Sequence, residues 1–285
     1  MKTLIRSLWA LSFACSIFFI GCSNATDPVT TENITSSEDN ALIDGEFSVL
    51  FATASAQGDV SNETAANRKS NSIAGKNEKC DLLPICATVD NDTTKNEITI
   101  DYGNQNCLCS DGLMRRGKIM INYTGTWKSI GSIIEVTLKD YYVQDLKVTG
   151  KKTVTIFSTT SFIVLVEDAT MITPKGTISW ASNHTITQTK GYSTKNTTSD
   201  DEFSILGGST GTNSEGVKYT ATIDNLNPLI KRVSCKQKDF SAGILTIQND
   251  KGKTLVINYD PQNTKGCNKN STCTVNGKTY NMKLR

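Results

Sequence analysis

From residue 80 onward, apolar and polar residues alternate along the chain with a period of two. The segments 98–102, 119–123 and 134–138 each place apolar side chains at every second position. Similar runs follow at residues 154–156, 162–166, 178–180, 217–223, 244–247, 255–259 and 280–284. Successive side chains of a β-strand point to opposite faces, so this pattern is typical of strands with one buried face. Because turn residues separate the runs and no long helical pattern interrupts them, we predict an all-β, antiparallel sandwich or barrel-like fold for residues 80–285.

The first 22 residues have the pattern of a secretion signal. A basic start precedes an apolar run over residues 8–20, which is too short to cross a bilayer comfortably, and Gly21 stands immediately before Cys22. The arrangement resembles a bacterial lipoprotein signal, in which residues 1–21 are removed and Cys22 becomes the acylated N-terminus. Phe19 departs from the leucine usual at its position. The alternatives are a plain cleaved signal and an N-terminal membrane anchor.

The charge of the mature chain gives no reason to expect a nucleic-acid partner. Of 30 basic residues, Lys2 and Arg6 lie in the signal, which leaves 28 against 28 acidic residues. A neutral protein lacks the excess of positive charge that phosphate backbones attract. We therefore expect a membrane contact through the lipid on Cys22 alone, with a protein located on the bacterial cell envelope, at the outer membrane or cell surface.

Two polar stretches flank one short amphipathic segment before the β domain. Residues 22–40 are rich in Ser, Thr, Asn, Asp and Glu, which predicts a flexible tether. Apolar residues then recur at helical spacing, namely Ile43, Phe47, Leu50, Phe51 and Ala54. We predict a short helix and a polar linker over residues 41–79, with Asp39 or Asn40 as the helix cap.

Seven cysteines remain in the mature β region and linker once Cys15 and Cys22 are set aside. They are Cys80, Cys86, Cys107, Cys109, Cys235, Cys267 and Cys273. Outside the cytoplasm such residues pair as disulfides, and their spacing does not match the paired C-x-x-C motifs of structural zinc sites. The odd number requires at least one free thiol or an intermolecular bond.

A faint internal repeat suggests which cysteines pair. In each half of the β region, a cysteine precedes an [IV]-x-I-[DN]-Y strand, a second cysteine follows in a loop, and a Gly-Lys pair opens a later strand. The echo predicts the bridges Cys86–Cys107 and Cys235–Cys267. It leaves open whether residues 80–285 form one domain or two related halves.

Several of these segments carry a resemblance to a known kind of protein. They are Ile98–Gly103, Asp111-Gly112, Arg115–Ile119, Tyr123-Thr124-Gly125, Tyr141-Tyr142-Val143 and Val148–Val154. Together they resemble a group of uncharacterised secreted lipoproteins of the Bacteroidetes type. The resemblance implies an exported all-β domain over about residues 80–285. It brings no catalytic residue, cofactor or ligand with it.

Two motifs point weakly to a catalytic site. Residues 207–211 fit G-x-S-x-G, but a nucleophile elbow needs a helix after the serine and a later histidine. His184, the only histidine, comes earlier, and a strand-like segment follows the motif. Asp140 and Asp145 could form a glycosidase carboxylate pair, although acids at both ends of a strand are common. We predict no catalytic residue.

No metal site and no cofactor are expected either. The acidic run 200–202 offers oxygen ligands for calcium, but its spacing does not match an EF-hand loop. His184 shares a predicted strand face with Ile178, Trp180 and Ile186, which is typical of a half-buried structural histidine.

Aromatic residues provide the remaining candidate site. Trp127 and Tyr142 flank a Gly- and Lys-rich stretch and could stack on sugar rings, although aromatic residues also fill β-sheet cores. We therefore expect a noncatalytic binding or structural module whose partner is a glycan or a surface protein. The alternative is a hydrolase that acts on an extracellular polymer.

Overall fold

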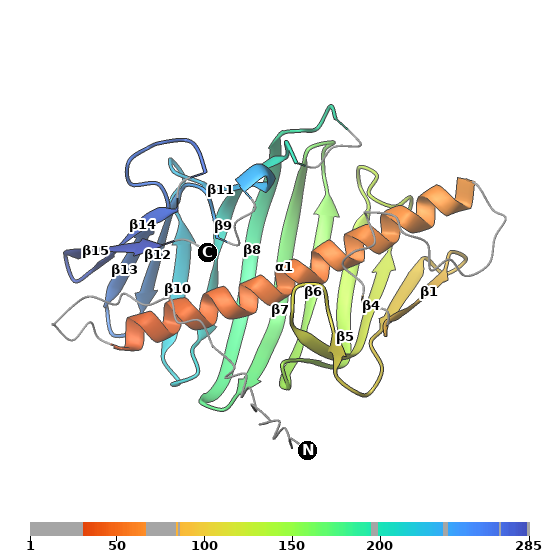
Figure 1. Ribbon diagram of the computed structural model, residues 1–285, viewed down its shortest axis with the longest axis horizontal. Helices are drawn as coiled ribbons and strands as arrows, with labels where there is room; N and C mark the ends of the chain where they lie inside the picture. The colour runs from red at the N-terminus through yellow and green to blue at the C-terminus, as the bar shows by residue number, and fades with distance from the viewer. Residues whose placement is uncertain are drawn as a thin grey trace, which may run out of the picture.

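The computed structural model describes residues 31–66, 84, 86–194, 199–235, 239–267 and 269–283. In these ranges one long helix, α1 (Thr31–Ala66), precedes fifteen β-strands and a short 3-10 helix, η1 (Val233–Cys235). The strands are β1 (Thr88–Asp92), β2 (Glu97–Asp101), β3 (Cys107–Leu108), β4 (Met114–Tyr123), β5 (Ile133–Val143), β6 (Leu146–Ile156), β7 (Ser161–Thr173), β8 (Gly176–Lys190), β9 (Glu202–Thr212), β10 (Lys218–Ile223), β11 (Leu229–Arg232), β12 (Ile244–Asn249), β13 (Thr254–Asn258), β14 (Asn270–Val275) and β15 (Lys278–Lys283). Strands and helix form two layers, with α1 crossing one face of the sheet (Figure 1).

All described strands belong to one antiparallel sheet. Its main path runs β1-β2-β4-β5-β6-β7-β8-β9-β10-β12-β13-β14-β15, while β3 pairs with β4 and β11 pairs with β9. Within the described ranges, the outer strands β1 and β15 do not pair with each other, so the sheet is open. The predicted antiparallel β architecture is confirmed. The sandwich or barrel-like form is corrected, because the layer that covers the sheet is a helix and the sheet does not close on itself.

Because most neighbouring strands follow one another in the chain, their connections gather at two ends of the sheet. We call the end with the β4–β5, β6–β7 and β8–β9 connections the loop end. The opposite end, with the β5–β6, β7–β8 and β9–β10 connections, is called the turn end. A strand rises about 3.3 Å per residue, so the 11 to 15 residues of the central strands separate the two ends by about 35–45 Å.

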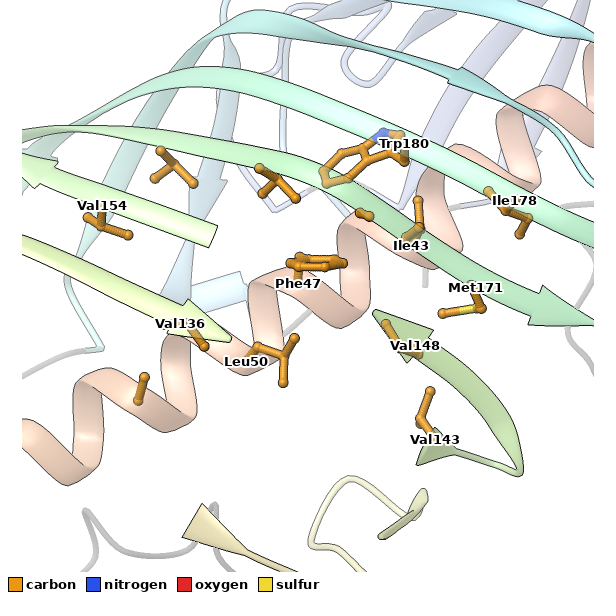
Figure 2. Close-up of a cluster of buried hydrophobic side chains, with 14 of the residues drawn as sticks. Ile43, Phe47, Leu50, Val136, Val143, Val148, Val154, Met171, Ile178 and Trp180 are labelled. Carbon is orange, nitrogen blue, oxygen red and sulfur yellow. The ribbon is translucent and has the colours of Figure 1, made fainter. Parts of the chain in front are cut away.

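Helix α1 buries one continuous stripe against the sheet. Its members recur at intervals of four and three residues, namely Ser36, Asn40, Ile43, Phe47, Leu50, Ala54 and Gln57. This spacing keeps side chains on one face of a helix. The middle of the stripe is apolar and packs on strand side chains such as Val148, Met171 and Trp180, as Figure 2 shows. The Phe47 and Trp180 rings lie 5.9 Å apart between centroids.

The helix is longer than the predicted short helix. It begins at Thr31, inside the predicted tether of residues 22–40. The N-terminal part of the buried stripe is polar, and this hid it from a search for apolar periodicity. Ser36 and Asn40 are buried there because polar side chains of the sheet form hydrogen bonds with them, as described below.

A glycine in β6 allows the helix to approach the sheet closely. Gly150 has a φ of 134° and lies where the register with β7 shifts between Thr149 and Lys151. A Cβ atom at this position would lie 2.9 Å from Cζ of Phe47 and 2.8 Å from Cα of Ala169. A side chain at Gly150 would therefore displace the aromatic ring that anchors α1.

Both predicted disulfides are confirmed. Cys86 is bonded to Cys107 across 21 residues of sequence, and Cys235 to Cys267 across 32. Two further cysteines, Cys109 and Cys273, are buried and lie outside these bridges. Cys80 lies outside the described residues.

The equivalent strands of the proposed internal repeat do not pair equivalently. Strand β2 pairs directly with β4, which contains the first Gly-Lys pair at residues 117–118. Strand β13 instead pairs with β14, and the second Gly-Lys pair, at residues 277–278, leads into β15. The repeat therefore predicted both disulfides correctly, but the strands of its two halves are not paired in the same way.

The docking of α1 depends on Phe47, which predicts a large effect of truncation. We expect Phe47→Ala to lower the free energy of unfolding by about 3–5 kcal/mol, the usual loss for a buried phenylalanine. Ser48→Ala, at the neighbouring exposed position, is the matched control and should change it by less than about 0.5 kcal/mol. Urea titration followed by tryptophan fluorescence measures both, and equal midpoints would contradict the structure.

Candidate functional site

A buried ion pair joins the middle of α1 to the turn end of the sheet. Arg115 of β4 is 2% exposed, and its guanidinium donates to both carboxylate oxygens of Glu46, at 3.3 and 3.1 Å. Asp111, in the connection between β3 and β4, accepts a further bond from Arg115 at 2.9 Å. The Tyr141 hydroxyl of β5 donates to Glu46 at 2.6 Å. One carboxylate of α1 is therefore held by two adjacent strands.

The surroundings of this pair fix its protonation states. Burial alone would lower the pKa of Arg115, but its bonds to Asp111 and Glu46 raise that pKa above the usual value. Burial, and then the negative charge of Glu46, raise the pKa of Tyr141 well above its ordinary range. Burial also raises the pKa of the Cys109 thiol. The guanidinium is charged and the phenol and thiol are neutral at physiological pH, so none of them is prepared to act as a nucleophile.

A second set of polar contacts fixes the N-terminal part of α1. The side-chain oxygen of Asn40 accepts from Nε1 of Trp180 at 2.9 Å and from Oγ of Ser209 at 2.7 Å. Closer to the helix start, contacts reach the β9–β10 connection at the turn end. There Asp39 accepts from the Ser214 backbone N–H at 2.6 Å, Ser36 from the Asn213 amide at 3.0 Å, and Glu215 from the Thr35 hydroxyl at 3.1 Å.

The third polar group on this face surrounds Lys152 of β6. Its Nζ donates to the backbone carbonyl of Phe47 at 2.8 Å, and burial lowers the pKa of Lys152 to about 8 against the opposing effect of Asp44. His184 of β8 lies within electrostatic reach of both Asp44 and Lys152, and burial lowers its pKa. His184 is therefore neutral at pH 7, in agreement with the structural role expected for it.

The helix-covered face thus uses its ionisable side chains to hold α1. Glu46, Arg115 and Lys152 are nearly inaccessible to solvent, at 5, 2 and 5% exposure. A buried polar group is tolerated when its hydrogen bonds are satisfied, and these bonds run between helix and sheet. These polar groups fix the position of α1 on the sheet.

The predicted aromatic site is not assembled as a platform. Trp127 is buried at 8% exposure and packs edge-on against Tyr123, with ring centroids 5.1 Å apart. Trp127 therefore fills the core and is not available for stacking. Tyr142 is half-buried, and the Arg116 guanidinium covers one face of its ring at 3.9 Å from the centroid. Its role in ligand binding stays a prediction.

Asp140 and Asp145, the two carboxylates of the glycosidase hypothesis, have separate environments. Asp145 pairs with Arg116 and accepts from the Asn106 amide, and these bonds lower its pKa. Asp140 has a φ of 47° at the register shift of β5, and its backbone carbonyl lies against Gly117. A general acid requires a raised pKa, whereas the bonds of Asp145 lower its pKa.

The other sequence motifs lie on strands and turns. Residues 207–211 are part of β9, in the middle of the sheet, and not of a strand–helix elbow. In the acidic run, Glu202 forms ion pairs with Lys190 and Arg232. Within the described ranges, no three His, Cys, Asp or Glu side chains come together in a way that could hold a metal ion. The lipidation residue Cys22 lies outside the described residues, and the described helix contains no apolar span long enough to cross a membrane.

The loop end carries a row of exposed apolar side chains that the sequence analysis missed. Ile130, Phe157 and Tyr192 are 62, 47 and 62% exposed. One stands in each of the β4–β5, β6–β7 and β8–β9 connections. Strands lie about 4.8 Å apart, so successive members are about 10 Å from each other. Isolated apolar residues in loops carry no periodic signal, and only the strand order places these three together.

The loops hold these side chains outward through local hydrogen bonds. The Ser129 hydroxyl donates to the Thr126 carbonyl at 2.8 Å in the loop that contains Ile130. The Ser158 hydroxyl accepts from the Ser161 N–H at 2.9 Å in the loop that follows Phe157. Apolar side chains that are fixed in an exposed position are typical of interaction sites. We call Ile130, Phe157 and Tyr192 the apolar loop row.

Comparison with known proteins gives no family for this chain. No protein-family description matches it, and no similar curated protein or solved structure is found. The resemblance to secreted lipoproteins of the Bacteroidetes type therefore stays a prediction. The candidate site rests on the geometry alone.

The buried ion pair predicts that removing one charge is costly. Glu46→Gln leaves Arg115 buried with one carboxylate less, and we expect a loss of about 3 kcal/mol in the free energy of unfolding. Asp145→Asn removes a carboxylate from the exposed pair with Arg116 and should change stability little. Replacing both Glu46 and Arg115 by Met should recover part of the loss. Equal effects of Glu46→Gln and Asp145→Asn in urea titrations would refute the structural role of the pair.

The buried Lys152 predicts a characteristic pH dependence. Its pKa is about 8 in the folded protein and 10.5 ordinarily, so between these values the unfolded chain holds the proton more tightly. Raising the pH therefore favours the folded state, by about 1.4 kcal/mol per unit above pH 8. The stability difference between the wild type and Lys152→Met should shift by about 2 kcal/mol between pH 7 and 9.5 in favour of the wild type. The matched variant Lys175→Met, in an exposed turn, should show no such shift. If the stability difference between the wild type and Lys152→Met did not change with pH, the burial of Lys152 would be contradicted.

Proposed function

We propose that this protein is a noncatalytic binding or structural module of the bacterial cell envelope, attached to a membrane by lipid on Cys22. The observation that carries the proposal is the apolar loop row, whose three side chains are exposed in successive connections at one end of the open sheet. Its partner is a glycan or another surface protein. The second candidate, a hydrolase of an extracellular polymer, has less support because Asp140 and Asp145 have no environment that suits an acid–base pair.

The rest of the sheet supports a scaffold that presents this row. The helix-covered face is occupied by α1, and the opposite face consists mainly of threonine, lysine and other polar side chains that alternate with the core residues. Two disulfides lie near the two ends of the strand order, which suits an exported protein. A rigid scaffold that positions loops is a common way to build a recognition surface.

Binding should depend on the apolar loop row. We expect Ile130→Asp and Tyr192→Asp, alone and combined, to weaken partner retention by at least tenfold each, because exposed anchors lose both contact area and compatibility with an apolar partner surface. Lys175→Asp, at the opposite end of the sheet, is the matched control. All variants should keep the thermal stability of the wild type, since the substituted side chains are exposed.

The measurement is a binding screen of immobilised protein against cell-wall and host glycans and against solubilised envelope proteins. Loss of a ligand in the loop variants and not in Lys175→Asp supports the proposal. If the protein releases product from any polymer, and Asp140→Asn or Asp145→Asn abolishes this release, the hydrolase replaces the binding module as the proposed function. A partner that tolerates every loop variant would exclude the apolar loop row as the binding surface.

A further inference from the structure

We propose that the turn end of the sheet lies against the lipid bilayer, so that the apolar loop row is presented away from it. The inference rests on the proposed lipid anchor at Cys22 and adds the surface with which the folded domain meets the membrane. The occupant of this surface is a layer of lipid headgroups. Two observations carry the inference, namely where α1 begins and how short the preceding chain is.

Helix α1 begins at the turn end. Three of its first side chains, Thr35, Ser36 and Asp39, form hydrogen bonds with the β9–β10 connection. That connection belongs to the turn end, and Figure 1 shows the first turns of α1 near that end of the sheet. The chain that leads back to Cys22 therefore leaves the domain at the turn end.

The length of that chain decides between the two ends. Nine residue steps separate Cys22 from Thr31, which span at most about 30 Å when fully extended and about 15–20 Å as a flexible coil. The loop end lies about 35–45 Å from the turn end along the strands. If the loop end faced the bilayer, Thr31 would stand farther from the headgroups than the chain can reach. The apolar residues at the loop end would alone favour the opposite orientation, and the length of the chain overrules them.

The composition of the turn end suits a headgroup surface. Exposed lysines lie in or next to its turns, at Lys175, Lys251 and Lys278. Leu108 and Ile172 add exposed apolar side chains, at 57 and 51%. Lysine interacts favourably with lipid phosphates, and short apolar side chains enter the interfacial layer.

The acidic groups of this end are largely engaged within the protein. Asp111 is bonded to Arg115, and Asp145 to Arg116. The carboxylate of Glu215 accepts a hydrogen bond from the hydroxyl of Thr35. The two ion pairs reduce the repulsion of lipid phosphates by this end.

Tryptophan quenching by brominated lipid tests the orientation in the full lipidated protein. The native Trp127 and Trp180 of the mature β domain are buried, at 8 and 3% exposure, and provide the background signal. Leu108→Trp places a probe at the turn end and Tyr192→Trp at the loop end. Ile172→Trp is a second turn-end probe should Leu108→Trp fold poorly. Each protein is reconstituted in phosphatidylcholine vesicles, with and without bromine on the acyl chains.

We expect bromine to reduce the fluorescence of the turn-end probe at least twofold and to leave the loop-end probe unchanged. Quenching of Tyr192→Trp, or of no probe in protein that floats with the vesicles, would overturn the orientation and leave the anchor intact. Failure of the wild type to float, or flotation of Cys22→Ala as efficient as that of the wild type, would overturn the lipid anchor itself and the orientation with it.

Discussion

The contact between α1 and one face of the sheet is the interaction on which this structure depends. An open antiparallel sheet has one face that must be covered if its apolar side chains are to leave water. Here the cover is a single helix, which lies across strands from β4 to β14 and buries Ile43, Phe47 and Leu50 at 1% exposure or less. Without α1, Val148, Met171 and Ile178 of the sheet would lose their packing partners.

Polar contacts give this packing a defined register. Apolar side chains alone would permit the helix to shift along the sheet, because their attraction has little directionality. Glu46, Asn40 and Asp39 each find their partners at one position only, on three different parts of the sheet. A shift of α1 by one turn would remove Glu46 from Arg115 and leave this buried guanidinium with Asp111 as its carboxylate partner. The buried charges therefore contribute more to the uniqueness of the arrangement than to its net stability.

The sequence predicts the parts of the fold that follow from local pattern. Alternation of apolar and polar residues located most of the strands, and the repeated cysteine pattern led to both disulfides. The helix start was missed because Ser36 and Asn40 are polar, although each lies in the buried stripe. Their partners lie more than 130 residues away in the sequence, so no local window contains the reason for their burial. The apolar loop row was missed for the same reason, since only the strand order brings Phe157 and Tyr192 to one end of the sheet.

The position of α1 in the chain has a consequence for how the molecule forms. The helix is synthesised before the described strands, yet the groups that bind it come from residues 115, 141, 180, 209 and 214. Contacts between residues so far apart in the sequence form slowly, so the N-terminal segment must wait with Phe47 and Glu46 in water until β9 is present. During this interval the apolar stripe of α1 has no sheet to cover it. A chaperone that holds amphipathic helical segments would shorten the exposure, and folding yield should depend on it more than in a protein whose covering helix follows its sheet.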